Sequence, residues 1–350
     1  MGVPFLILLS VLSAQSAQSV PSASAAPEES GRLVILNKAA DTAQILQLPD
    51  GNVLATLDTG AGPHEVAVAP DGKWAVVSNY GREEAGSSLS LLNLEKLEKG
   101  PVIDLGAKLR PHGLAFSPDG KSVYVTGETQ AQLWKLSFPH GTVEARMDTR
   151  AKVSHMVALG KERAYVANIG SGSITPVDLA AGKALDPVPT GGGAEGIGVA
   201  PDGRVWVTNR EADTVSVVDG GKLQVEKSFD CPGFPIRVVF SPDGALAFVS
   251  CPQAGAVALF DARALAPLKR IKIALPAADA GDGRLFGSQF GDSPVPIGMA
   301  AAPHGCLYVA LAGADRVAVL DWKARSVLRF LPTGREPDGI AWIPAPAGRD

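Results

Sequence analysis

A segment that recurs seven times constrains the fold of this chain more than any other feature. Its clearest copy is PHGLAFSPDGKSVYVTG at residues 111–127, and the copies begin at Pro63, Pro111, Ser154, Ala194, Pro235, Pro296 and Pro337. Successive starts are 48, 43, 40, 41, 61 and 41 residues apart. Most copies join two apolar runs through a Pro-Asp-Gly turn, in which proline at the second position and glycine at the end suit a type I turn. Each complete copy therefore predicts two antiparallel strands.

The rest of each repeat predicts two more strands. A third run, such as DTVSVVD (213–219) or GAVALFD (255–261), follows a polar loop, and a fourth run, such as VLRFLPTG (327–334), comes after it. These runs are rich in the β-branched and aromatic residues that favour strands. Four strands in about 40 residues, repeated seven times, predict an all-β fold, a seven-bladed β-propeller of four-stranded antiparallel blades.

The two ends of the repeat array are expected to complete one blade together. The last copy supplies only a first strand, from Pro337, whereas residues 32–60 contain a second, third and fourth strand but no first. Joining them closes the ring and leaves no open sheet edge. We therefore expect one propeller domain over residues 32–345, with residues 346–350 as a tail.

Residues 1–26 are expected to form a signal peptide. An apolar stretch from Pro4 to Leu12 precedes small and polar residues, and Ala23-Ser24-Ala25 resembles a cleavage site. One feature is atypical, because the first basic residue is Arg32. The expected location is therefore secreted or periplasmic. No apolar run after this stretch approaches the ~18 residues of a membrane-spanning helix, so no membrane span is expected.

The motifs VYVTGE, YVANIGSGSITPVDL and VWVTNREADTVSVVD resemble those of the YVTN-repeat (YncE-like) seven-bladed β-propellers. The resemblance covers nearly all of residues 32–345 and implies the propeller fold. Similar propellers include lactonases, quinoprotein amine dehydrogenase β-chain-like proteins, haem d1 proteins and members without known activity. The resemblance therefore leaves the function open.

The topology places one residue of each repeat at the same end of the central channel. In a propeller the first strand of each blade is innermost, so the residues that open these strands surround one mouth of the channel. In ring order they are Asp338, His64, His112, His155, Glu195, Ile236 and Ile297. At the next position most repeats have glycine, whereas Glu65 and Arg237 carry charges. We therefore expect His64, Glu65, His112, His155, Glu195, Arg237 and Asp338 to form a ligand-binding site.

Three interpretations of this histidine arc stay open. In the first, the histidines are structural and satisfy neighbouring backbone carbonyls. In the second, a polar ring binds an organic anion or performs acid–base chemistry, since histidine titrates near neutrality. In the third, His64, His112 and His155 bind a divalent metal, because imidazoles with a carboxylate suit zinc, copper, iron or nickel.

The longest spacing, 61 residues, contains an extended loop at residues 274–295 on the same face of the predicted ring. A long loop at a binding face is often a lid. It would bring Arg284, Phe286 and Phe290 towards the channel mouth. The alternative is an insertion without a role.

Of the three cysteines, two are expected to pair. Cys231 precedes the first strand of one blade and Cys251 ends the second strand of that blade, so both lie near the same face. An exported protein permits a Cys231–Cys251 disulfide. Cys306 begins a strand at the opposite face and is expected to be a buried thiol.

Other classes of site and partner find little support. The net charge of −4, without a basic stripe, argues against nucleic acid as a partner. The segment GGGAEG (191–196) lies between two predicted strands, so no NAD site is expected, and no C-x-x-C-H motif for covalent haem occurs. No catalytic motif such as G-x-S-x-G is present.

These observations predict an exported, monomeric binding or accessory protein. It would hold a small molecule or a protein partner at the channel mouth, because the polar arc and the long loop share a face and no catalytic motif is complete. One alternative is an enzyme, either a lactonase-like hydrolase or a metal-dependent lyase, with an arc histidine as acid or base and Glu195 or Asp338 as metal ligand. A second alternative is a cell-surface interaction protein.

Overall fold

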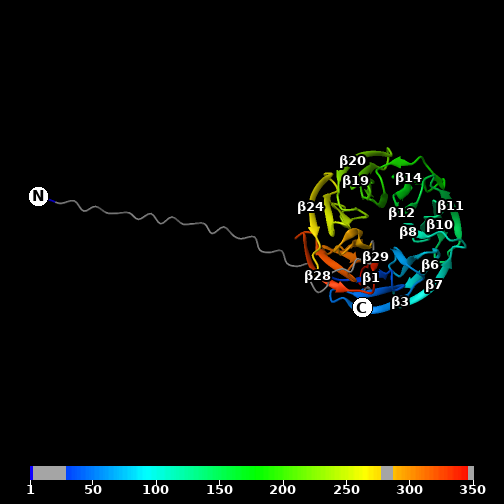
Figure 1. The fold of residues 1–350 in the computed structure, drawn as a ribbon, viewed down its shortest axis with the longest axis horizontal. Coiled ribbons are helices and arrows are strands. Elements are labelled where there is room, and N and C mark those ends of the chain that lie inside the picture. Colours follow the sequence, from blue (N-terminus) through cyan, green and yellow to red (C-terminus); the bar gives the residue numbers. More distant parts are fainter. Residues whose placement is uncertain (3–28, 277–286, 346–350) are drawn as a thin grey trace.

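The computed structural model describes residues 1–2, 29–276 and 287–345. Within these residues the strands form seven antiparallel sheets arranged as blades around a central axis (Figure 1). The predicted seven-bladed β-propeller is therefore confirmed. The expected signal peptide falls almost wholly on residues 3–28, outside the described part of the chain.

The blades share one radial order of strands. The innermost strands are β4 (Pro63–Val68), β8 (Pro111–Phe116), β12 (Ser154–Leu159), β17 (Ala194–Val199), β21 (Arg237–Phe240), β25 (Pro296–Ala301) and β29 (Pro337–Ile343). The second strands are β5 (Trp74–Gly81), β9 (Ser122–Gly127), β13 (Arg163–Asn168), β18 (Val205–Asn209), β22 (Leu246–Cys251), β26 (Cys306–Leu311) and β1 (Arg32–Asn37).

The outer half of each blade carries the third and fourth strands. The third strands are β6 (Ala85–Asn93), β10 (Gln132–Ser137), β14 (Ser173–Asp178), β19 (Thr214–Asp219), β23 (Ala256–Asp261), β27 (Arg316–Asp321) and β2 (Thr42–Gln47). The outermost are β7 (Glu98–Asp104), β11 (Val143–Asp148), β20 (Gln224–Asp230), β24 (Ala266–Lys272), β28 (Ser326–Pro332) and β3 (Asn52–Asp58). In one blade this strand is split into β15 (Lys183–Ala184) and β16 (Val188–Pro189).

The described residues also include two 3₁₀ turns, η1 (Ile169–Ser171) and η3 (Gly287–Phe290). No helix in this part of the chain is long and apolar enough to cross a membrane.

Strand β29 joins the blade of β1, β2 and β3, as the sequence predicted. It pairs antiparallel with β1 in the register Val34↔Ala341 and Arg32↔Ile343. The indole Nε1 of Trp342 also donates a hydrogen bond to the carbonyl oxygen of Ser30 at 2.9 Å. One blade is thus built from both ends of the repeat array, which closes the ring.

Asparagines at one repeat position, at or near the end of several second strands, link neighbouring segments. Asn79 donates through Nδ2 to Ser88 Oγ at 2.9 Å, and its Oδ1 accepts from the backbone N–H of Gly60 at 3.0 Å. A Cβ added at Gly60 would lie 2.5 Å from the amide group of Asn79, so the chain passes too closely for any other residue. The side chain of Asn79 therefore has a structural role.

Glycine at the third position of the innermost strands sets how closely adjacent blades approach. A Cβ added at Gly339 would lie 2.5 Å from the backbone carbonyl oxygen of His64, and one added at Gly298 would lie 2.1 Å from that of Asp338. Real Cβ atoms do not come so near to a carbonyl oxygen. The glycines therefore permit neighbouring inner strands to converge on the axis.

We expect Gly339→Ala to destabilise the protein by about 1–3 kcal/mol, because the added methyl group overlaps a rigid backbone carbonyl. Urea unfolding followed by tryptophan fluorescence would measure the loss. Gly192→Ala is the matched control, since its Cβ would find its nearest neighbour at an ordinary 3.6 Å. Equal stabilities for the two variants would show that inner-strand approach does not depend on this glycine.

Candidate functional site

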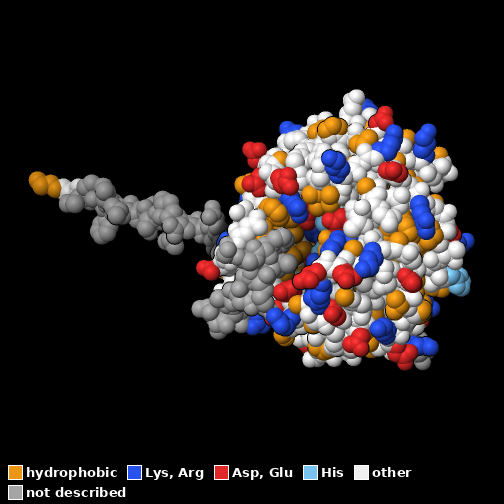
Figure 2. Space-filling model, turned by 45° about the vertical axis from the view of Figure 1, so that its right-hand side comes forward, with side chains coloured by type: hydrophobic (Ala, Val, Ile, Leu, Met, Phe, Trp, Pro, Cys, Tyr) orange, Lys and Arg blue, Asp and Glu red, His pale blue; other side chains and the backbone are white. Residues whose placement is uncertain are grey.

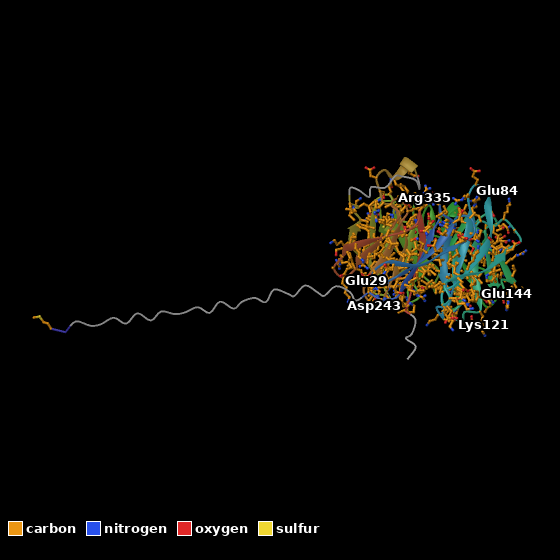
Figure 3. All side chains as sticks on the ribbon, turned by 90° about the horizontal axis from the view of Figure 1, so that it is seen from below. Glu29, Glu84, Lys121, Glu144, Asp243 and Arg335 are labelled. Atoms are coloured by element: carbon orange, nitrogen blue, oxygen red, sulfur yellow. The ribbon has the colours of Figure 1, made fainter. Side chains whose placement is uncertain are left out.

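The site lies at the end of the ring where the innermost strands begin, which we call the top face. Figure 3 shows the disc edge-on, with Glu84 and Arg335 on the top face and Lys121 and Asp243 in turns of the opposite face. In the space-filling view a hollow opens at the centre of the ring, with acidic and basic side chains around its rim (Figure 2).

The histidine cluster consists of His64, His112 and His155, which come from the adjacent strands β4, β8 and β12. The ring centroids of His64 and His112 are 4.2 Å apart, and those of His112 and His155 are 3.5 Å apart. All three residues are buried, at 8, 0 and 6% exposure. The predicted arc therefore converges into direct ring contacts, which sequence alone could not establish.

His64 is held by a carboxylate from the neighbouring blade. Its Nδ1 makes a short contact with Asp338 Oδ2, and Lys38 Nζ lies 3.1 Å from the same oxygen. Burial lowers the pKa of His64, and the charge of Asp338 offsets this only in part. Burial alone would raise the pKa of Asp338, yet His64 and Lys38 hold it well below its usual value. Asp338 is therefore a fixed anion that leaves Nε2 of His64 for another partner.

His112 has the most unusual environment of the three. It is fully buried, and neither Nδ1 nor Nε2 has a hydrogen-bond partner among the described residues. Burial lowers its pKa well below the usual value, and the neighbouring His155 and His64 lower it further. The ring is therefore a neutral imidazole at pH 7. The expectation that it satisfies a backbone carbonyl finds no such contact here.

One group of donor atoms is close enough to share a ligand. Single donor atoms of His64, Glu65 and His112 all lie within 4.8 Å of one another. His155 was predicted as the third member of a metal set, but the compact group has Glu65 in that place. Glu65 reaches the group because it follows His64 on β4 at a position where most repeats have glycine.

His155 faces two carboxylates instead. Its Nε2 lies 3.5 Å from Glu195 Oε1, and its Nδ1 lies 3.9 Å from Glu128 Oε1. Burial would raise the pKa of Glu195, but His155, Arg237 and Arg210 outweigh it and lower the pKa to about 2. Glu195 is therefore ionised across the physiological range.

Arg237 connects opposite sides of the ring. Its guanidinium contacts Glu65 on β4 and Glu195 on β17. Burial alone would lower the pKa of Arg237, but the charges of Glu65 and Glu195 raise it above the usual value. Glu65, Arg237 and Glu195 thus form one connected set of charges at the mouth.

Four residues of the site were missed by the sequence analysis. They are Lys38, Tyr80, Glu128 and Arg210, which directly follow Asn37, Asn79, Gly127 and Asn209, the same position of the repeat in four second strands. Tyr80 packs edge-on against His64 and His112, with ring centroids 5.0 and 5.4 Å away. Burial raises the pKa of Tyr80, and the neighbouring Glu128 adds to the effect. The comparison of repeats did not include this position, which lies one residue beyond the end of the aligned copies.

The remaining side of the mouth is apolar. Ile236, Ile297 and Phe290 belong to one buried cluster, and the ring of Phe290 lies 5.1 Å from that of Phe234. Of the predicted lid residues, Phe290 therefore packs over the isoleucine sector. Arg284 and Phe286 lie outside the described residues.

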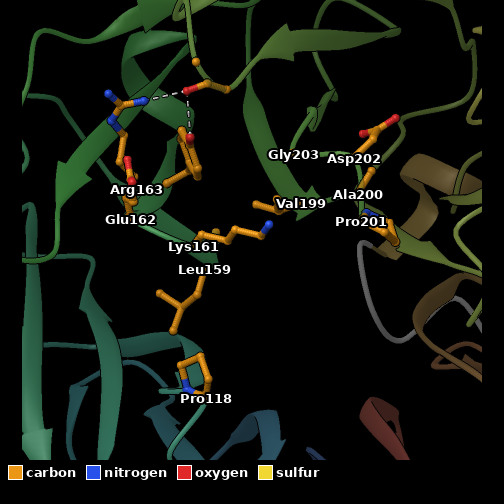
Figure 4. A pocket seen from close by; sticks show the side chains of 14 residues that line it. Pro118, Leu159, Lys161, Glu162, Arg163, Val199, Ala200, Pro201, Asp202 and Gly203 are labelled. Atoms are coloured by element: carbon orange, nitrogen blue, oxygen red, sulfur yellow. Dashed lines mark hydrogen bonds between the residues drawn. The ribbon is translucent and has the colours of Figure 1, made fainter.

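A pocket of about 560 Å³ opens on the opposite face, between turns of three blades (Figure 4). Arg163 Nη1 and Tyr165 OH point to one side of it, and both donate to the carbonyl oxygen of Gly220, at 2.7 and 3.0 Å. These two polar groups therefore already have backbone partners, unlike the nitrogens of His112.

A comparison with protein families identifies a related family. The profile described as "Lactonase, 7-bladed beta-propeller" matches residues 37–266. No curated protein matches the sequence significantly.

Solved structures share the fold at low sequence identity. Hydrazine synthase of Kuenenia stuttgartiensis has a TM-score of 0.65 at 17% identity, covering 80% of this chain and 89% of that one. A functionally unknown protein of Desulfotomaculum acetoxidans has a TM-score of 0.73 at 13% identity, covering 89% and 99%. Virginiamycin B lyase of Staphylococcus aureus has a TM-score of 0.67 at 12% identity, covering 83% and 92%. At these identities the similarity concerns the fold alone.

The cysteines predicted to pair lie side by side as free thiols. Cys231 Sγ and Cys251 Sγ are 3.7 Å apart, and both residues are buried. A disulfide needs about 2.05 Å, so a modest side-chain movement would be enough. Cys306 is buried in another core cluster, and burial raises its pKa to about 12.

We expect oxidised glutathione to convert Cys231 and Cys251 into a disulfide by thiol exchange, with the glutathione leaving as two thiols. Closing a loop whose ends are 20 positions apart should stabilise the protein by about 3 kcal/mol. Non-reducing peptide mapping and the melting temperature would report it. Cys251→Ser is the control. Recovery of both thiols in alkylatable form after oxidation and unfolding would contradict the pairing.

Proposed function

The chain belongs to the family of seven-bladed β-propeller lactonases, and from this premise we propose that it is a metal-dependent lactonase. Its metal would be held by His64, Glu65 and His112 at the top-face mouth. The observation that carries the proposal is the convergence of three donor atoms from these residues within 4.8 Å.

The donor set suits a catalytic metal. Two imidazoles and one carboxylate form a three-ligand set that leaves a fourth position for water or substrate, as in many catalytic zinc sites. Ligands on a tetrahedral zinc ion stand about 3.3 Å apart, so small side-chain rotations would bring the donors together. Neutral imidazole is the form that ligates, and burial favours it at both His64 and His112.

The surroundings of the donors support the same assignment. The contact between His64 Nδ1 and Asp338 Oδ2 matches the carboxylate–histidine–metal arrangement, in which the carboxylate fixes the ring and directs the other nitrogen to the metal. The two nitrogens of His112 without hydrogen-bond partners give a second reason for the metal site. An unpaired buried polar atom destabilises the folded protein, and a bound ligand would offset this cost. Asp338 and Glu195 act here as partners of histidines rather than as direct ligands.

In lactone hydrolysis a water oxygen bonds to the ester carbonyl carbon, the ring C–O bond breaks, and a hydroxy acid is released. A bound divalent metal polarises the carbonyl and lowers the pKa of water. Asp338 and Lys38 keep the ring of His64 oriented. Because His64 and His112 are buried, their donor nitrogens have little contact with bulk water. Tyr80, which stays protonated, borders the place where substrate enters.

Metal binding and lactone cleavage together also test the expectation of a binding or accessory protein. A protein that binds metal but cleaves no lactone would fit that role. A lyase would be recognised by its products, because it eliminates without adding water. Export, a monomeric state and membership in the YVTN-type group remain predictions.

We expect purified protein to contain, or to bind after chelation, about one Zn²⁺ or Co²⁺ per chain and to hydrolyse members of a panel of γ- and δ-lactones. His112→Ala and Glu65→Gln should each reduce kcat/KM at least about 100-fold, because the metal supplies several kcal/mol of transition-state stabilisation. Metal analysis and acid release with a pH indicator would measure both.

His140→Ala provides the control, because His140 is exposed in a turn remote from the mouth. It should retain metal and activity. A wild-type protein that binds no divalent metal and cleaves no lactone would refute the proposal.

A further inference from the structure

We propose that Arg237 is a positioning residue that holds Glu65 in the orientation needed to ligate the metal. The inference rests on the proposed metal site and deepens it. It assigns to Arg237, which carries a permanent positive charge, a role that runs against simple electrostatics, because a cation beside a metal site would ordinarily weaken metal binding.

The first observation is that the contact crosses the ring. Arg237 is on β21, whose neighbouring inner strands are β17 and β25, whereas Glu65 is on β4, between β29 and β8. The two blades do not touch through their inner strands in the way that adjacent blades do. The side chains of Arg237 and Glu65 therefore meet only because both extend towards the axis.

The second observation is the pattern of donors. Arg237 Nε and Nη2 both donate to the same oxygen, Glu65 Oε1, at 3.1 and 2.6 Å. Nη1 donates to Glu195 Oε1 and to the carbonyl oxygen of Ile236, each at 3.1 Å. Every nitrogen of the guanidinium is therefore engaged, and the group is 5% exposed.

The third observation follows from the second. Because both donors converge on Oε1, the other carboxylate oxygen of Glu65, Oε2, is not held by Arg237. A carboxylate can bind a metal with one oxygen while the other accepts hydrogen bonds that fix its plane. The backbone N–H of Glu65 is also fixed, since Ser78 Oγ accepts from it at 3.0 Å. Arg237 thus immobilises a carboxylate with one oxygen left for the metal.

Charge balance makes this role compatible with a cation. The guanidinium lies between Glu65 and Glu195, and Asp338 adds to the negative potential there. The positive charge is therefore neutralised before a metal enters. Lysine could not reproduce the contact, because one ammonium group cannot form the planar fork that two N–H donors of arginine make.

The test is Co²⁺ binding by the full-length protein carrying Arg237→Lys, measured by competition with a chelating dye and by the visible spectrum of bound Co²⁺. Positioning predicts that the Lys variant binds Co²⁺ about 10–100-fold more weakly, with an altered spectrum, although its charge is unchanged. If Arg237 acted only through its charge, the Lys variant would bind as the wild type does. That result would overturn the proposal.

In a second variant, positioning of Glu65 and simple charge repulsion predict opposite changes in Co²⁺ affinity. Removal of the charge in Arg237→Met should weaken Co²⁺ binding if Glu65 is positioned, and should tighten it if the guanidinium merely repels the metal. Should the Met variant fail to fold, the Lys variant decides the question alone. In a Glu65→Gln background, Arg237→Lys should cause no further loss, since its effect passes through Glu65.

Arg204→Lys is the matched control. Arg204 also directs Nε and Nη2 to one carboxylate oxygen, Asp202 Oδ2, at 2.8 and 2.5 Å, but it lies on the opposite face. The Arg204→Lys substitution should leave the affinity for Co²⁺ unchanged. Wild-type protein that binds no Co²⁺ would defeat the proposed function itself, whereas normal wild-type binding with an unaffected Lys variant would defeat only the positioning role.

Discussion

The close approach of neighbouring inner strands is the constraint on which the site depends. A seven-bladed ring would ordinarily hold side chains of different blades too far apart to share a ligand. Here glycines such as Gly298 and Gly339 let one strand pass against the backbone carbonyls of the next. His112 stands one position before Gly113, whose added Cβ would lie 2.8 Å from the carbonyl oxygen of His155, so the same approach that packs these blades brings His112 and His155 into ring contact.

The buried charges at the mouth occur where the sequence departs from the usual pattern of the repeat. Glu65 and Arg237 stand at the third position of their repeat copies, where most copies have glycine, and their side chains contact each other across the ring. Each would be costly as an isolated buried charge. Together with Glu195 they form a neutralised set, so the departures are mutually dependent. A variant that removes one member must therefore be judged with its partners in mind.

Much of this could be predicted from sequence, and the missing part has a physical reason. The period of the repeat fixed the number of blades, the closure by β29 and the common face of His64, His112 and His155. It could not show that Glu65, rather than His155, joins the compact donor group, because that depends on side-chain rotamers across the ring. Lys38 and Tyr80 could have been found, since they directly follow Asn37 and Asn79, which occupy the same position of the repeat.

The environment of His112 separates a structural from a chemical role for the cluster. A histidine retained only to build the repeat would hydrogen-bond its surroundings, as Asn79 does with Ser88 and Gly60. His112 instead places two unpaired nitrogens in a fully buried position, between two other imidazoles. Such an arrangement lowers the stability of the folded chain unless a ligand compensates it. Among the described residues, these unpaired nitrogens lie beside the carboxylates Glu65 and Asp338 and the guanidinium of Arg237, and this combination is the reason for proposing a ligand here rather than a packing role alone.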